Sequence, residues 1–326
     1  MKTCRQWARA VGAALACLAA MPMLGQAQEF PSKPLRLVVP YPPAGIADTF
    51  SRALAQQMSE RLGQPVIAEN KAGGSMIIGA EAVVKAPPDG YTLFLGSISS
   101  LALNVGMFKK LPYDPVKDFA PVSLAFYTPL FLMVNPQVPA TSARELIAYA
   151  RARPGAVNFG SVGYGSSIHL AAEMLKLMTR IDIVHVPYKG SSQVLPDLLS
   201  GRVQMLFDGG ANLSHARSGK VRLLAVTSAK RLESMPEVPT LSESGVPGYE
   251  MAIWFGVLAP SGTPRPVVDR LSREIAEIVK QPTLKARFAD SGVEVVSNTP
   301  EAFAELISSD IRKWVALLAE AGFQPQ

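Results

Sequence analysis

Residues 35–62 read LRLVVPYPPAGIADTFSRALAQQMSERL and predict a buried strand, a loop and a helix. The apolar, β-branched run at 35–39 is typical of a strand that is covered on both faces. The proline- and glycine-containing segment 40–45 cannot continue a strand, and the apolar residues that recur every four positions after it predict an amphipathic helix with Asp48 as its N-cap. Such a turn places backbone N–H groups at the positive end of a helix, which favours an anion, although many βα turns bind nothing.

The N-terminal segment 1–27 has the layout of a secretory signal peptide. Three basic residues precede an apolar run at 10–24 that is too short to span a bilayer, and small residues at 25 and 27 suit cleavage before Gln28. Cleavage would remove three basic residues and no acidic one, so the formal net charge would fall from +6 to +3. We therefore expect a soluble periplasmic protein without a nucleic-acid partner, and without disulfides because both cysteines lie in the removed segment.

Two stretches of the chain share one order of elements. The first has strands predicted at 35–39, 65–69 and 91–95, with helices between them. The second has strands predicted at 157–159, 182–186 and 203–207, with a glycine-serine loop at 160–167. Each stretch is a βαβαβ unit, which predicts a parallel sheet in an α/β fold.

Two βαβαβ units joined by crossing segments predict two lobes that face each other across a cleft. We assign residues 28–128 and 252–326 to lobe 1 and residues 129–251 to lobe 2. The aromatic segment 249–258 should cross back to lobe 1, which places Trp254 near the hinge and the cleft. Ligands of open α/β sheets lie beyond the carboxyl ends of the strands, so the loops 42–48 and 160–167 are candidates for holding a carboxylate.

The sequence contains little that favours catalysis. It has no Gly-x-Ser-x-Gly elbow, no His-Glu-x-x-His pair and no P-loop lysine pattern, and its three histidines are too scattered for a metal site. His185 fits a core position within an apolar strand, and His169 fits either packing or a position facing the cleft. Ser166 and Ser167 are typical N-caps, and Asp208 can either face the cleft or form a turn.

Five motifs, taken together and in this order, resemble the Bug-type receptors, the extracytoplasmic solute-binding proteins of tripartite tricarboxylate transporters. They are Pro42-Pro43-x-Gly45-x-x-Asp48, Pro87-Pro88-Asp89-Gly90-Tyr91-Thr92-Leu93, Gly165-Ser166-x-x-His169-Leu170, His185-Val186-Pro187-Tyr188-Lys189-Gly190 and Val238-Pro239-Thr240-Leu241. The resemblance covers nearly the whole mature chain. It implies a type II periplasmic-binding-protein fold, with two α/β lobes, a hinge and a ligand cleft.

The resemblance also implies the ligand site, in which backbone N–H groups and ordered water from the loops 41–48 and 161–167 hold a small carboxylate. The residue that matches Asp48 can meet a ligand amino group, and the one that matches Asp208 lies on the cleft wall. Two departures from the family pattern are Ala44 in place of a glycine and the apolar pair at 76–77, which make citrate-like tricarboxylates doubtful. The expected ligand-binding residues are Tyr41, Pro43, Ala44, Gly45, Ala47, Asp48, Ser97, Ser161, Gly163, Gly165, Ser166, Ser167, His169 and Asp208.

These observations predict a periplasmic solute-binding protein that captures a small organic acid for a membrane permease. We expect it to be a monomer and to have no cofactor, no metal and no catalytic residue. A ligand sensor that presents its closed form to a signalling partner is an alternative in the same class. A secreted hydrolase or isomerase that uses His169 or Asp208 is the alternative from another class.

Overall fold

The part of the chain that the computed structural model describes comprises residues 30–232, 234–320 and 325. The predicted signal peptide at 1–27 lies outside these residues. The described residues from Lys33 onwards form one compact unit, to which the following description refers. In the described residues, no helix combines the length and the apolar character that crossing a membrane requires.

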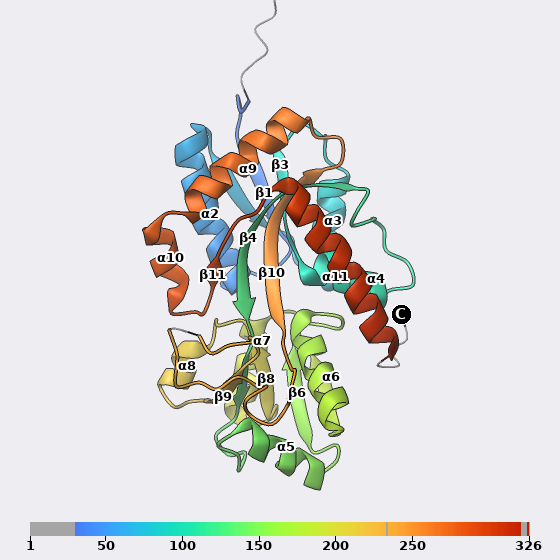
Figure 1. Ribbon diagram of the computed structural model, residues 1–326, viewed down its shortest axis with the longest axis vertical. Coiled ribbons are helices and arrows are strands. Elements are labelled where there is room, and N and C mark those ends of the chain that lie inside the picture. Colours follow the sequence, from blue (N-terminus) through green and yellow to red (C-terminus); the bar gives the residue numbers. More distant parts are fainter. Residues whose placement is uncertain (1–29, 233, 321–324, 326) are drawn as a thin grey trace, which may run out of the picture. The chain divides into compact units, whose positions relative to one another are not determined.

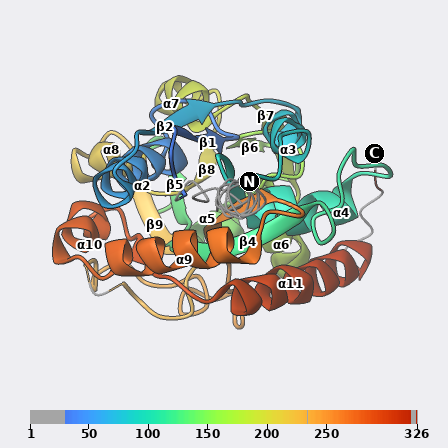
Figure 2. The ribbon, with the colours of Figure 1, turned by 90° about the horizontal axis from the view of Figure 1, so that it is seen from above.

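The first sheet has six strands in the order β11-β4-β10-β3-β1-β2 (Figure 1). Its strands are β1 (Leu35–Val39), β2 (Val66–Asn70), β3 (Thr92–Ser97), β4 (Phe119–Pro129), β10 (Ala252–Pro260) and β11 (Glu294–Val295). Around it lie α2 (Ile46–Leu62), η1 (Gly74–Met76), α3 (Ile77–Val84), η2 (Ser99–Leu103), α4 (Asn104–Met107), α9 (Arg265–Val279), α10 (Pro282–Ala289) and α11 (Pro300–Glu320). Helix α9 packs on α2 and β4, and α11 packs on β4 and η2 (Figure 2).

The second sheet has five strands in the order β7-β6-β8-β5-β9. Its strands are β5 (Phe131–Val134), β6 (Val157–Ser161), β7 (Ile183–Pro187), β8 (Met205–Asp208) and β9 (Arg222–Val226). The helices of this part are α5 (Ala143–Ala152), α6 (Ser167–Thr179), α7 (Ser191–Ser200) and α8 (Leu213–Arg217).

The two sheets repeat one arrangement of parallel strands. In the first sheet β1 pairs in parallel with β2 on one side and β3 on the other, and in the second sheet β6 pairs in the same way with β7 and β8. Antiparallel strands extend both sheets, with β10 beside β3 and β5 beside β8. The predicted βαβαβ units and the α/β fold with two lobes are thereby confirmed.

The chain passes between the sheets where β4 ends at Pro129 and β5 begins at Phe131, and it returns in the segment before β10. The boundaries predicted between residues 128 and 129 and between 251 and 252 stay predictions.

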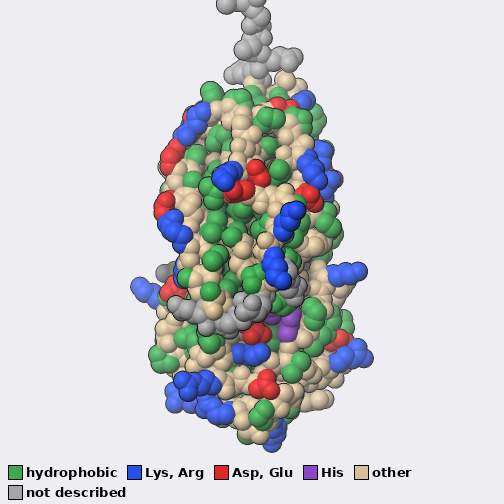
Figure 3. Space-filling view, turned by 90° about the vertical axis from the view of Figure 1, so that its right-hand side faces the viewer, with side chains coloured by type: hydrophobic (Ala, Val, Ile, Leu, Met, Phe, Trp, Pro, Cys, Tyr) green, Lys and Arg blue, Asp and Glu red, His purple; other side chains and the backbone are tan. Residues whose placement is uncertain are grey.

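On the face shown in Figure 3, acidic and basic side chains lie interspersed among hydrophobic ones, rather than forming a stripe of one sign.

Three aromatic rings join α2 to the crossing strands within the core. Phe50 of α2 packs on Phe126 of β4 with 4.1 Å between the ring centroids, and Phe126 stacks on Phe255 of β10 at 4.4 Å. All three side chains are buried. Because aromatic pairs of this kind add to the free energy of burial, the N-terminal half of α2 is held firmly against the strands that connect the lobes.

Candidate functional site

A pocket of about 540 Å³ lies at the carboxyl ends of the parallel strands of both sheets. The segments that follow β1, β2, β6, β7 and β8 all contribute to its wall, which is the position that ligands occupy in open α/β sheets. The lining comprises residues 40–47, 72–76, 128, 130, 162–163, 167–168, 188–190, 195, 209, 211–212, 253 and 255.

Half of the predicted ligand-binding residues line this pocket. They are Tyr41, Pro43, Ala44, Gly45, Ala47, Gly163 and Ser167. The other seven, which do not contribute to the lining, are Asp48, Ser97, Ser161, Gly165, Ser166, His169 and Asp208. The contacts of the second group show that they hold the loops in place.

Asp48 was predicted as the N-cap of α2, and this prediction is wrong. The helix begins at Ile46 after Gly45, which provides no side-chain cap, so Asp48 lies in the first turn. Its Oδ2 accepts the N–H of Ala44 at 3.0 Å, its Oδ1 accepts Asn70 Nδ2 at 2.8 Å, and Arg52 forms an ion pair with it at 2.9 Å. Burial alone would raise the pKa of Asp48, but the hydrogen bonds from these three residues outweigh it and lower the pKa.

The loop before α2 contains a strained residue. Ala44 has φ 69°, in the left-handed region where a Cβ atom is unfavourable, at the position where the sequence departs from the Bug pattern. The hydrogen bond from its N–H to Asp48 spans the turn. Tyr41, at the start of the loop, shares a 2.7 Å hydrogen bond with the buried Ser97, so that Ser97 supports the loop from β3.

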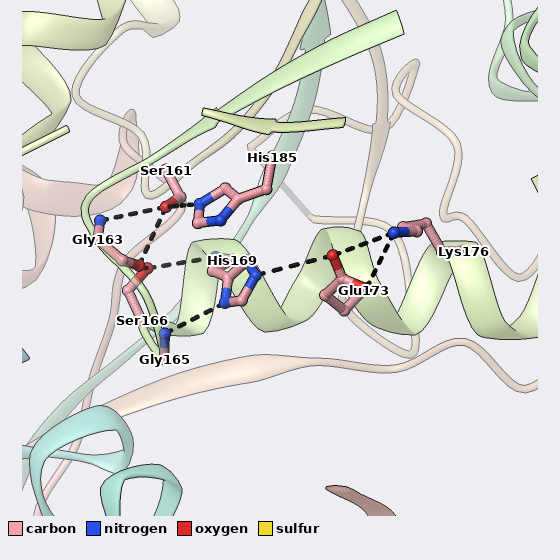
Figure 4. Close-up of polar contacts among 8 residues, drawn as sticks. All are labelled: Ser161, Gly163, Gly165, Ser166, His169, Glu173, Lys176 and His185. Carbon is pink, nitrogen blue, oxygen red and sulfur yellow. Dashed lines mark hydrogen bonds and ion pairs between the residues drawn. The ribbon is translucent and has the colours of Figure 1, made fainter. Parts of the chain in front are cut away.

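The glycine-serine loop of the second lobe is held by two serines (Figure 4). Ser161 Oγ accepts the N–H of Gly163 at 3.1 Å and donates to the Gly163 carbonyl at 3.0 Å. Ser166 Oγ donates to the same carbonyl at 2.7 Å and accepts the N–H of His169 at 3.3 Å, which confirms Ser166 as the N-cap of α6. Both hydroxyls therefore serve the loop itself.

Two stacked imidazoles lie behind this loop (Figure 4). The rings of His169 and His185 are 3.9 Å apart between centroids, and Phe159 stacks on His185 at 5.0 Å. His169 Nδ1 accepts the N–H of Gly165 at 3.1 Å, and His185 Nε2 shares a 2.6 Å hydrogen bond with Ser161 Oγ. An Nδ1 that accepts an N–H carries no proton, so His169 is neutral in this arrangement.

The surroundings of the two rings favour their neutral forms. Burial, together with the charges of His185 and Lys176, lowers the pKa of His169 to about 3. Burial and Lys176 also lower the pKa of His185 to about 4. Burial raises the pKa of the nearby Glu173, whose Oε1 lies 3.7 Å from His169 Nε2.

Asp208 forms the turn at the end of β8. Its Oδ1 accepts the N–H groups of Gly210 at 2.8 Å and Asn212 at 3.0 Å, and its Oδ2 accepts Asn212 Nδ2 at 2.8 Å. The side chain is fully buried, and this burial raises its pKa despite the hydrogen bonds. Of the two roles open from the sequence, the contacts match the turn-forming aspartate, while Asn212 lines the pocket.

Two hydrogen bonds connect loops of the two sheets beside the pocket. Ser75 Oγ donates to the Tyr164 carbonyl at 2.9 Å, and Ser99 Oγ accepts the N–H of Ser167 at 3.1 Å. Ser75 has φ 52°, a left-handed conformation that L-residues adopt at some cost in free energy. The segment 72–76, which contains Ser75 and Met76, lines the pocket.

Several lining residues were absent from the predicted site. Residues 188–190 directly follow the predicted strand at 182–186, so the rule about carboxyl ends could have found them. Leu130, Ile253 and Phe255 belong to the crossing segments, and their position at the pocket depends on strand pairing that the sequence does not reveal.

In the described part of the chain, no group of three or more His, Cys, Asp or Glu side chains is arranged to hold a metal ion.

Comparisons with known proteins agree with this architecture. Residues 50–323 match the model of a family described as "Tripartite tricarboxylate transporter family receptor". The protein BugT of Bordetella pertussis is 38% identical over 298 residues, which cover 91% of each chain.

Two solved structures are similar along most of the chain. Rpa4515 of R. palustris, solved with adipate, has a TM-score of 0.88 at 37% identity and covers 91% of this chain and 100% of its own. MatC (Rpa3494) of Rhodopseudomonas palustris, solved with bound malate, has a TM-score of 0.83 at 31% identity and covers 89% of this chain and 100% of its own. The family match spans most of the sequence, so the chain belongs to the tripartite tricarboxylate transporter family of periplasmic receptors and is a solute-binding protein rather than an enzyme.

Proposed function

We propose that the exported chain captures a small organic carboxylate in the 540 Å³ pocket and delivers it to the membrane subunits of a tripartite transporter. The proposal includes cleavage of a signal peptide before Gln28, a monomeric mature chain, and lobes formed by residues 28–128 with 252–326 and by 129–251. The seven loop residues that line the pocket are the proposed ligand contacts, and the other seven predicted residues support them.

The observation that carries this proposal is the first turn of α2. Gly45, Ile46 and Ala47 all line the pocket, and α2 has no side-chain cap. Within the described residues, no acceptor is found for the N–H groups of Ile46 and Ala47. Backbone N–H groups at a helix N-terminus attract an anion. Two similar receptors were solved with adipate and with malate, which supports a carboxylate as the ligand class.

The test is a thermal-shift series with acids and their amides. The purified mature protein is heated with acetate, hexanoate, adipate and malate, and with the matching amides, which have the same size and no charge. A ligand at a concentration of 100 times its Kd stabilises the native state by about 2.7 kcal/mol, so an acid that binds should raise the Tm by several degrees. Equal shifts from an acid and its amide would contradict a carboxylate site.

The signal peptide needs a separate measurement. Expression of the full chain in a Gram-negative host, followed by the intact mass of the periplasmic product, should give a chain that begins at Gln28. Recovery of the uncleaved chain from the cytoplasm would contradict the proposed export.

A further inference from the structure

We propose that the ligand is a monocarboxylate whose remaining part is apolar and at least as large as a benzene ring, rather than a tricarboxylate, a dicarboxylate or an amino acid. This inference rests on the proposed function, which supplies the carboxylate. It adds the chemistry of the rest of the ligand, which follows from the side chains of the pocket wall.

Apolar side chains from both lobes form most of the wall. Ile46 and Met76 contribute from the first lobe, Ile168 and Leu195 from the second, and Leu130 and Ile253 from the crossing segments. Phe255 lines the pocket next to Tyr41, with an edge-to-face contact of 5.7 Å between the two ring centroids. The Tyr41 hydroxyl is occupied by Ser97, so it does not add a free polar group to the wall.

The described wall offers no carboxylate as a counter-ion for a ligand ammonium group. No aspartate or glutamate lines the pocket among the described residues. Asp48 is 4% exposed and is paired with Arg52 and Asn70, and Asp208 is fully buried and bonded to its own turn. A buried cation without a counter-ion is unfavourable, so an amino acid should bind poorly here.

The wall is also a poor match for a second carboxylate. Lys189 is the one basic residue among the described lining residues. It is exposed and lies just before Gly190, the N-cap of α7. A distal carboxylate that reached Ile253, Leu130 or Met76 would lose its hydration without gaining a charged partner. An apolar group in the same place would instead gain from leaving water.

The volume of the pocket fits a ligand with a substantial apolar part. An apolar cavity of about 150 Å³ in another protein is large enough to bind benzene. The pocket here has about 540 Å³, which leaves room for a carboxylate, a ring or a medium-length acyl chain, and water. Each further buried methylene should tighten binding about fourfold, equivalent to about 0.8 kcal/mol.

Isothermal titration calorimetry of the purified mature protein with four acids tests the inference. Hexanoate, adipate and 6-aminohexanoate share a six-carbon chain and differ at the far end, which carries a methyl, a carboxylate or an ammonium group, and acetate lacks the chain. We expect hexanoate to bind at least tenfold more tightly than each of the other three. If adipate, 6-aminohexanoate or acetate binds as tightly as hexanoate, the inference is wrong and the proposed function stands. If none of the four acids binds, both are contradicted.

A pair of variants on α7 provides the matched control. Leu195 lines the pocket, whereas Leu199 is on the same helix, 38% exposed and outside the lining. Leu195→Arg should shift the ratio of the adipate and hexanoate Kd values at least tenfold towards adipate, because it adds a cation to the wall. Leu199→Arg adds the same charge elsewhere and should leave this ratio unchanged. Equal ratios in the two variants would overturn the inference, provided that both keep the circular dichroism spectrum of the parent.

Discussion

Acidification from pH 7 to pH 5 should destabilise this protein through the stacked pair of His169 and His185, and the substitution His169→Gln should remove about half of that effect. The pKa of His169 is about 3 in the native state, because the ring is buried beside His185 and Lys176, and an imidazole in the unfolded chain has a pKa of about 6.5. Between these two values, the unfolded state binds more protons than the native state. The free energy of unfolding therefore falls as the pH decreases through this window and is fully recovered above pH 6.5.

The size of the effect follows from the two pKa values. At pH 7 an unfolded-state imidazole is mostly neutral, and at pH 5 it is almost fully protonated, while native His169, with a pKa of about 3, stays neutral at both. The free energy of unfolding should thus drop by about 2 kcal/mol per histidine between pH 7 and pH 5. His185, with a pKa of about 4, should contribute nearly as much. The raised pKa of Glu173 acts in the opposite direction, so the comparison between variants is more informative than the total.

The assay is urea unfolding followed by far-ultraviolet circular dichroism at pH 7 and pH 5. His169→Gln removes the Nδ1 atom that accepts the Gly165 N–H, which lowers the free energy of unfolding at both pH values. This loss cancels when the free energies at pH 7 and pH 5 are subtracted. His215→Gln removes an imidazole on α8, outside the stacked pair, and is the matched control for the loss of one histidine. If His169→Gln loses as much stability between pH 7 and pH 5 as the parent, the native His169 is not held neutral and the reasoning is wrong.

Three further predictions concern the loops. Ala44→Gly should raise the free energy of unfolding by up to about 1 kcal/mol, because relief of the left-handed strain at φ 69° exceeds the entropic cost of glycine; a lower urea midpoint would contradict this. Gly165→Val should abolish carboxylate binding, because Gly165 has φ 74° and an added Cβ would lie 3.2 Å from Met107 Cγ. Ser166→Ala should weaken binding only modestly and cost about 1 kcal/mol of stability through the lost N-cap. Calorimetry that finds the serine variant worse than the glycine variant would show that the hydroxyl is the main contact.

The repeated unit could be predicted from the sequence because its signals are local. Apolar runs, glycine-containing turns and helical spacing predict β1 and the body of α2, although not its first residue, and the same signals predict β6 and α6. Strand pairing then places the loops after β1 and β6 at one edge of each sheet, as the order of elements implies. The pocket position follows from topology alone.

The roles of individual side chains depended on contacts between distant segments. Asp48 has the residue type and spacing of an N-cap, but Asn70 and Arg52 hold it inside the turn. Trp254 was expected near the cleft, yet alternation along β10 places Ile253 and Phe255 at the pocket. Trp254 itself is 2% exposed and donates its Nε1–H to Asp310 of α11 at 2.5 Å. An aromatic strand has two faces, and its neighbours decide which of them meets the ligand.

The most direct test of carboxylate capture is the identity of the molecule that the protein carries. The mature chain is purified from a periplasmic extract without added ligand and denatured, and the released small molecules are measured by mass spectrometry. We predict an organic acid, released chemically unchanged in near-stoichiometric amount and able to rebind the refolded protein. Release of a neutral or cationic molecule that rebinds in the pocket would contradict the account.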